Sequence, residues 1–233
     1  MMIESPQPER TPAPMSTHIA NYPEVIDQLP AGSTLVLHDV GWDEYEELLE
    51  AVGEAKGLHI SYDEGTMQIM TLSALHEDYK VRINDLVRVA SLRLRIKVLC
   101  FGSATMRKKA KLKGVEPDLS FYVQTAAAIG SRTDLDFSVD PPPDIVVEID
   151  LQHPSLSKFP IYAALGVPEI WRYDGKSLTI YELTDEGYRA TPSSLAIPAL
   201  TSDTLTEFLA RSQHEDQYET ILAFEKWLET RQV

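Results

Sequence analysis

Apolar residues recur at helical spacing in two long segments of the chain, at 42 to about 56 and at 75 to about 94. Both segments are long and periodic enough to predict amphipathic helices. In the second segment, the face opposite the apolar stripe is basic. Three shorter helices are expected at 155–165, 202–211 and 218–230.

Short runs of β-branched and apolar residues separate these helices and predict strands. Asp63-Glu64-Gly65 is a turn signal, so the runs at 58–62 and 66–72 on either side of it are expected to form a hairpin. The apolar run at 145–149 is typical of a buried central strand. Further strands are expected at 35–37, 96–101, 116–123, 169–173 and 178–183. This pattern predicts an α/β domain.

The composition of the chain predicts its domain organisation. Residues 1–20 are rich in proline and polar side chains, which favours a disordered N-terminal tail. The remainder, 21–233, is expected to be one domain, because a chain of 233 residues that is 43% hydrophobic can form a well-buried core. No apolar run approaches the roughly 18 residues of a membrane span. The lone Cys100, expected in a buried strand, cannot form an internal disulfide, so we expect a soluble cytoplasmic protein.

Charge is distributed unevenly along the chain. The formal net charge of −15 argues against a nucleic-acid partner, because contacts with phosphates need cations. The segment 80–113, however, holds eleven of the 21 Lys and Arg residues and a single acid, Asp85. Such a segment could present a basic surface to a polyanion. A solvated helix face followed by a charged hairpin is an equally good interpretation.

Two carboxylates are the candidates for chemistry. Asp118 and Glu148 each lie in a short β-branched run. If neighbouring strand ends bring them together, they can hold a hard divalent cation, which takes oxygen ligands. Such an ion can polarise a phosphate and lower the pKa of a bound water, which is the chemistry of phosphodiester hydrolysis. Surface acids that close two strands are the alternative interpretation.

Several motifs occur in an order that resembles a known family. The order is His76-Glu77 at a helix start, Pro117-Asp118, Val147-Glu148-Ile149, Lys158 four residues before Tyr162, and Gly166-Val167-Pro168-Glu169-Ile170-Trp171. Over about residues 30 to 190 it is similar to the bacterial "putative restriction endonuclease" family of the PD-(D/E)XK nuclease superfamily. The resemblance implies an α/β, restriction-endonuclease-like fold, in which α-helices flank a mixed central β-sheet. An N-terminal β-hairpin, a nuclease core at about 57–185 and C-terminal helices at 202–230 would complete it.

The resemblance also implies a cofactor and its ligands. Asp118 and Glu148 would hold Mg²⁺ or Mn²⁺, with the backbone carbonyl of Ile149 as a further oxygen. Glu77 matches a third acidic ligand of the superfamily, although the helix macrodipole favours an acid in a first turn without any catalytic role. His76 could orient a water or a phosphate, and a structural role is the alternative.

The sequence departs from the superfamily at one position. Two residues after the glutamate, on the same face of the strand, members normally carry a lysine that stabilises charge on the phosphate. Here that residue is Asp150. Members of the resembled family carry the lysine on the following helix, so Lys158 is the expected replacement. An ordinary solvated helix lysine is the alternative.

The expected function is therefore a metal-dependent endonuclease acting on DNA, with Asp118, Glu148, Lys158 and Glu77 as catalytic residues. A homodimer would suit cleavage of both strands, which needs two symmetry-related sites. A catalytically degenerate binding or assembly protein with the nuclease fold is the alternative, favoured by Asp150 and the acidic total charge. Contacts with the DNA backbone are expected from Arg82, Arg107, Lys108, Lys109 and Lys111.

Overall fold

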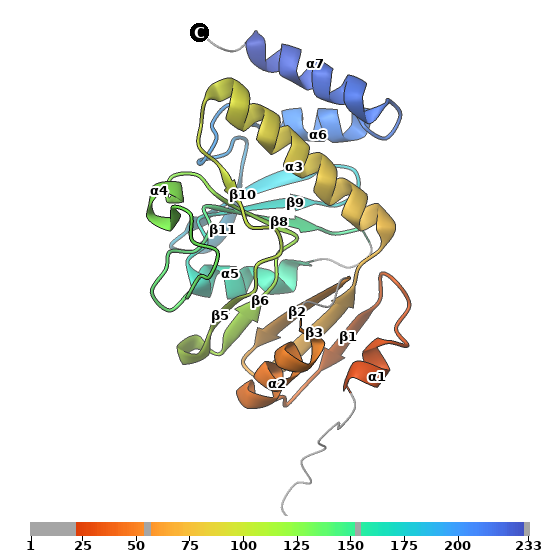
Figure 1. Cartoon of the computed structure of the whole chain (residues 1–233), viewed down its shortest axis with the longest axis vertical. Coiled ribbons are helices and arrows are strands. Elements are labelled where there is room, and N and C mark those ends of the chain that lie inside the picture. Colours follow the sequence, from red (N-terminus) through yellow and green to blue (C-terminus); the bar gives the residue numbers. More distant parts are fainter. Residues whose placement is uncertain (1–21, 54–56, 152–154, 231–233) are drawn as a thin grey trace, which may run out of the picture.

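The computed structural model describes residues 22–53, 57–151 and 155–230, so the tail predicted at 1–20 lies outside the described part. The strands form two sheets (Figure 1). The smaller is antiparallel in the order β1-β3-β2-β6-β5, with β1 (Thr34–Leu37), β2 (Leu58–Asp63), β3 (Thr66–Thr71), β5 (Met106–Lys108) and β6 (Lys113–Val115). The larger has the order β11-β10-β9-β8-β7-β4, with β4 (Leu99–Cys100), β7 (Leu119–Tyr122), β8 (Ile145–Ile149), β9 (Glu169–Tyr173), β10 (Leu178–Thr184) and β11 (Gly187–Thr191).

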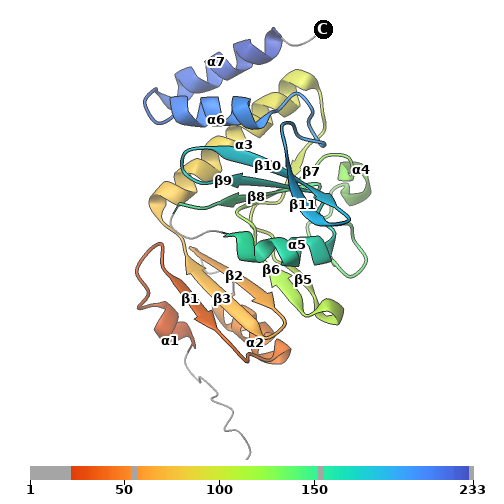
Figure 2. The ribbon, with the colours of Figure 1, turned by 180° about the vertical axis from the view of Figure 1, so that it is seen from behind.

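Helices cover both faces of the six-stranded sheet (Figures 1 and 2). On one face α3 (Ala74–Leu94), α6 (Ser202–Arg211) and α7 (Gln217–Glu229) share a buried apolar cluster with alternate residues of the strands. On the other face lies α5 (Phe159–Leu165), which packs against residues of β8 and β9. Strands β8 and β9 are parallel and the other pairs are antiparallel. The predicted mixed sheet flanked by helices is therefore confirmed.

The five-stranded sheet has an apolar core of its own, covered by α1 (Tyr22–Ile26) and α2 (Trp42–Val52). Trp42, Tyr45 and Tyr62 form its centre, and the rings of Tyr45 and Tyr62 stack with their centroids 4.9 Å apart. Gly114 of β6 lies against the Tyr45 ring. Close approach of the β6 backbone to this ring therefore fixes the position of the segment that leads to Asp118.

The register of β7 and β8 determines where the polar side chains point. Ile145, Val147 and Ile149 join the cluster under α3, so Glu148 points to the opposite face, toward α5. Leu119 pairs with Val147, and the Asp118 N–H donates to the Val147 carbonyl (3.0 Å). One step further in the same register, Asp118 lies opposite Glu148. Directly opposed residues of antiparallel strands are close neighbours.

The structure adds a second sheet to the predicted central one. The hairpin at 58–72 is the middle of the smaller sheet, where β2 also pairs with β6 and β3 with β1. Only Leu99–Cys100 forms from the strand expected at 96–101, and Cys100 is exposed rather than buried because β4 is an edge strand. Strand β11 and the short α4 (Ala126–Ile129) were not expected. None of the helices in the described ranges is long and apolar enough to cross a membrane.

Replacing Gly114 with alanine should destabilise the protein by about 1–3 kcal/mol, because the added Cβ overpacks a closed core. That Cβ would lie 2.2 Å from the Tyr45 hydroxyl oxygen and 2.7 Å from Cζ, in a ring with no exposed surface. Urea unfolding followed by tryptophan fluorescence measures the change. Gly41→Ser is the control, because nothing lies within 4 Å of its new Cβ and serine suits the position before α2. Equal stability of G114A and the wild type would contradict this packing.

Candidate functional site

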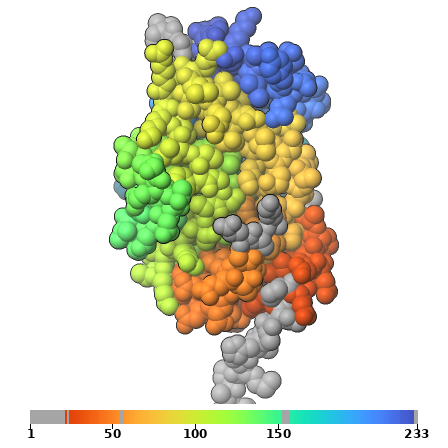
Figure 3. Space-filling model, in the orientation of Figure 1, coloured from red at the N-terminus to blue at the C-terminus, as the bar shows by residue number. Residues whose placement is uncertain are grey.

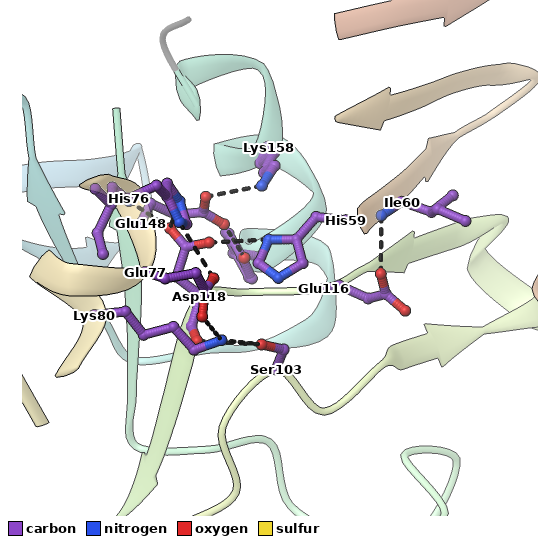
Figure 4. A network of polar contacts seen from close by, with 12 residues as sticks. His59, Ile60, His76, Glu77, Lys80, Ser103, Glu116, Asp118, Glu148 and Lys158 are labelled. Carbon is purple, nitrogen blue, oxygen red and sulfur yellow. Dashed lines mark hydrogen bonds and ion pairs between the residues drawn. The ribbon is translucent and has the colours of Figure 1, made fainter. Parts of the chain in front are cut away.

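The two carboxylates singled out by the sequence are buried where the two sheets meet. Asp118 has no exposed surface and Glu148 is 1% exposed. Figure 4 shows that side chains from both sheets, from α3 and from the segment that leads into α5 point toward them. Unpaired charges are costly in such a place, so the partners of each carboxylate determine what the site can do.

Two histidines contact Asp118. His59 of β2 places Nδ1 2.9 Å from Oδ1, and His76 in the first turn of α3 places Nε2 3.1 Å from Oδ2. The Ile149 N–H also donates to Oδ2 (2.6 Å). Burial favours the neutral acid, but the two histidines outweigh it and hold the pKa of Asp118 well below its usual range. Asp118 is therefore an anion at neutral pH.

Local structure holds both histidines in place. Ser73 caps α3 by accepting from the His76 N–H (3.2 Å), which fixes the first turn of the helix. Glu116 accepts from the Ile60 N–H (2.9 Å) and from the Thr105 hydroxyl (2.6 Å). Because Ile60 follows His59 and Glu116 precedes Pro117-Asp118, this carboxylate links the two sheets beside the His59–Asp118 contact (Figure 4).

A buried lysine and a tyrosine contact Glu148. Lys158 ends the 3₁₀ turn η2 (Ser155–Lys158), is 4% exposed, and donates from Nζ to Oε2 of Glu148 (2.8 Å). The Tyr162 hydroxyl donates to Oε1. Burial raises the pKa of Glu148, Lys158 opposes that rise, and the nearby Asp118 carboxylate adds to it, so the pKa reaches about 7. Burial alone would lower the pKa of Lys158, but Glu148 and Asp118 raise it, so Lys158 is a cation.

Asp150 has an arginine partner. Its carboxylate accepts from Nε of Arg172 on the neighbouring strand β9. The residue that replaces the superfamily lysine is therefore part of an ion pair, and the buried ammonium beside Glu148 belongs to Lys158. Lys158 is not a solvated helix lysine, because its side chain is almost fully buried.

Glu77 lies at the edge of this cluster. Its Oε2 is 3.4 Å from Lys80 Nζ, its Oε1 is 3.6 Å from His76 Nδ1, and its side chain is 46% exposed. Its contacts are therefore with cations rather than with Asp118 or Glu148. Lys80 also donates to Ser103 Oγ (3.1 Å). Glu77, Lys80 and Ser103 line a cleft of about 750 Å³, which His59 reaches from the other side.

The cluster offers donors for a cation, but not a finished coordination shell. His59 Nδ1, both ring nitrogens of His76, Glu77 Oε1 and Asp118 Oδ1 are buried without a hydrogen bond in the described part of the chain. Carboxylate and imidazole donors suit Mn²⁺, and the carboxylates alone suit Mg²⁺. Yet in the described ranges no three His, Cys, Asp or Glu side chains converge to hold a metal ion. The donor chemistry therefore fits a divalent cation, although Glu148 is engaged by Lys158 and Tyr162.

The cations expected to bind DNA are divided between two places and mostly have protein partners. Arg82 on α3 donates to Asp78 (2.7 Å) and to the Ser212 carbonyl. The others lie on β5 and on the 3₁₀ turn η1 (Lys109–Lys111) before β6. The partners in this hairpin are Glu46 for Arg107 (3.9 Å), Asp43 for Lys109 (2.9 Å) and the Ala164 carbonyl for Lys111. DNA binding by these residues and by Lys108 stays a prediction.

His59 is the residue of this cluster that sequence analysis did not consider. The sequence places His59 and Ser61 two positions apart in a predicted strand, so they share one face, and the structure shows that both are buried. A buried histidine on a strand needs a polar partner. The sequence could not identify that partner, because Asp118 belongs to the other sheet.

Comparisons with known proteins identify a family by sequence and a solved structure of similar fold. The Uma2 family, described as "Putative restriction endonuclease", matches residues 42–211. The crystal structure of "a putative nuclease belonging to DUF820 from Anabaena variabilis ATCC 29413" is similar in fold, with a TM-score of 0.51 and 16% sequence identity. The similarity covers 73% of this chain and 99% of that one. No curated protein sequence matches the chain.

Replacing Lys158 with methionine should destabilise the protein by about 3 kcal/mol near pH 8, because Glu148 then lacks its buried cation. Loss of this cation raises the pKa of Glu148 above about 7. The folded variant then keeps a proton that the unfolded chain releases, so its stability falls as the pH rises and the deficit widens above pH 7. Urea unfolding between about pH 6 and 8.5 tests this. K109M, which removes an exposed cation, should show no pH-dependent deficit, and equal deficits in both variants would count against the buried pair.

Proposed function

The chain belongs to the Uma2 family of "putative restriction endonuclease" proteins, and on this basis we propose that it is a metal-dependent endonuclease that hydrolyses DNA phosphodiester bonds. The observation that carries the proposal is a pair of buried carboxylates, Asp118 and Glu148, which lie opposite each other in the β7–β8 register. The Lys158 ammonium lies 2.8 Å from Glu148. Burial of two acids beside one lysine needs a functional reason, because it costs stability.

In this proposal Asp118 and Glu148 hold Mg²⁺ or Mn²⁺, with Glu77 and the Ile149 carbonyl as further oxygens. When bound, the ion supplies polarisation of a phosphate oxygen and a water of lowered pKa. Lys158 donates to the developing negative charge on the phosphate, in the role that Asp150 cannot fill. Support for this role is the burial of Lys158 and its contact with Glu148.

His59 and His76 position Asp118. They contact different oxygens of its carboxylate and keep it ionised, so that it is ready to act as a ligand. Glu116 maintains the His59 contact through the Ile60 N–H. Substrate reaches the cluster through the cleft that His59, Glu77 and Lys80 line.

One observation favours the second candidate function, a catalytically degenerate binding or assembly protein. Each of the two acids already has polar partner side chains of its own, and in the described residues no three ligands converge. In that case the two histidines and Lys158 would take the place of a metal beside the carboxylates. A homodimer, which cleavage of both strands would require, stays a prediction that light scattering tests.

Asp118→Asn and Glu148→Gln should each lower metal-dependent cleavage of a DNA duplex by about a thousandfold or more, because loss of a metal ligand removes several kcal/mol of transition-state stabilisation. Time courses on supercoiled plasmid with Mg²⁺ or Mn²⁺ measure the rate. Asp174→Asn is the control, since Asp174 accepts only local hydrogen bonds in the turn between β9 and β10. Undiminished cleavage by D118N or E148Q would exclude this site.

Calorimetric titration separates the two candidate functions. If the protein is a nuclease, wild type should bind Mn²⁺ and the D118N variant should bind it at least about tenfold more weakly, because one charged ligand is lost. A scaffold protein would give no heat of binding with Mg²⁺ or Mn²⁺ in wild type. That result would refute the nuclease proposal even if the fold is shared.

A further inference from the structure

We propose that one flank of α3, together with Lys97, forms a track for the sugar–phosphate backbone of a nucleic acid that leads to the carboxylate cluster. The inference deepens the proposed nuclease function and rests on it for the direction in which the strand runs. The track consists of Lys80, Arg88, Arg95 and Lys97, and it differs from the set of cations that the sequence singled out.

Helical geometry places Lys80 and Arg88 on one flank. An α-helix turns by about 100° per residue, so these two residues lie about 80° apart around the axis. Arg95 caps the C-terminus of α3, with a φ of 55°. Lys97 follows in the segment that leads into β4. Neighbouring protein atoms partly desolvate the Cys100 thiol and raise its pKa, and the charges of Arg88 and Lys80 oppose that rise, so both cations lie near β4.

The opposite flank of α3 is already occupied. There Arg82 pairs with Asp78, and Arg93 pairs with Glu225 of α7. Asp85 accepts from Gln217 of α7. This flank faces the C-terminal helices, and its charges are used in packing them. Asp78, Asp85 and Glu225 are therefore directed away from the proposed track, and Glu77 is the acid of α3 that lies at its inner end.

Three of the four track cations are exposed, and Lys80 is partly buried at the inner end of the track. Arg88, Arg95 and Lys97 are exposed, and none makes an ion pair or hydrogen bond through its side chain in the described ranges. In Figure 3 the yellow surface of α3 and of the segment after it lies open on one face, with the blue C-terminal helices to one side. A phosphate can therefore replace counterions there without breaking a protein contact. The hairpin cations Arg107 and Lys109, in contrast, already face Glu46 and Asp43.

The track is long enough to contact several phosphates of one strand, and its inner end lies beside the cleft. From Lys80 to Arg95 the helix rises about 22 Å, which corresponds to about six nucleotides along one strand of B-DNA. Lys80 marks the inner end, because it contacts Glu77 and Ser103 and lines the cleft beside His59. A strand that follows the cations from Arg95 to Lys80 therefore arrives at the site.

The test is DNA binding by the full-length protein in EDTA, so that cleavage cannot interfere. Fluorescence anisotropy with a labelled duplex of random sequence is recorded over a range of salt concentrations. In the triple variant Arg88→Gln/Arg95→Gln/Lys97→Gln the slope of log K against log salt should fall in magnitude by about 2 to 3. Each phosphate contact contributes about 0.9, so affinity near 0.1 M salt should fall by about 100-fold.

The control removes the same number of charges from arginines that have carboxylate partners and lie outside the expected DNA contacts, in Arg93→Gln/Arg132→Gln/Arg211→Gln. Its salt slope should match that of wild type. Equal losses in the two triple variants, or no DNA binding by wild type, would overturn the proposal. So would binding of polyglutamate as tight as that of DNA, because the surface would then select an acidic protein.

Binding and cleavage separate this inference from the proposed function. If the protein binds DNA through the track but does not cleave it with Mg²⁺ or Mn²⁺, the track is supported and the nuclease function is refuted. If the wild type cleaves DNA and the Arg88/Arg95/Lys97 triple variant binds and cleaves it equally well, the nuclease function is supported and the track is refuted. Thermal denaturation of all variants verifies that each is folded.

Discussion

The structure depends on holding two carboxylates, Asp118 and Glu148, opposite each other in a buried part of a sheet. Like charges at that separation repel, and burial strengthens the repulsion because little water screens it. The protein surrounds the pair with His59 and His76 on one side and Lys158 on the other. These three side chains come from β2, α3 and η2, so both sheets and the segment that leads into α5 must be in place before the pair is tolerated.

This constraint explains the arrangement of the neighbouring elements. The two-residue link between β3 and α3 brings the Ser73 cap and His76 to the end of β8. The connection from β8 through α5 to the parallel strand β9 brings Lys158 and Tyr162 back across the same face. Glu116 links Ile60 of the smaller sheet to the residue pair before β7. Each local element therefore contributes to the site through the position of one or two side chains.

The sequence predicted the features that depend on local pattern. The continuous apolar run at 145–149 identified β8 as a buried central strand, whereas its register with β7 is seen in the structure. The division into two sheets was not predictable, because it depends on which strands pair across long sequence separations. For the same reason His59 was missed, since its partner lies in a different sheet. The basic segment 80–113 was visible, but its separation into helix flank and hairpin depends on which acids fold against each cation.

Because His59 belongs to the five-stranded sheet and Asp118 to the six-stranded one, their contact couples the site to the docking of the two sheets. Proteins open in cooperative sub-regions at a lower free energy than global unfolding. Detachment of the smaller sheet would remove the His59 contact and expose Asp118 to water. The surroundings of Asp118 therefore depend on whether the two sheets are docked against each other.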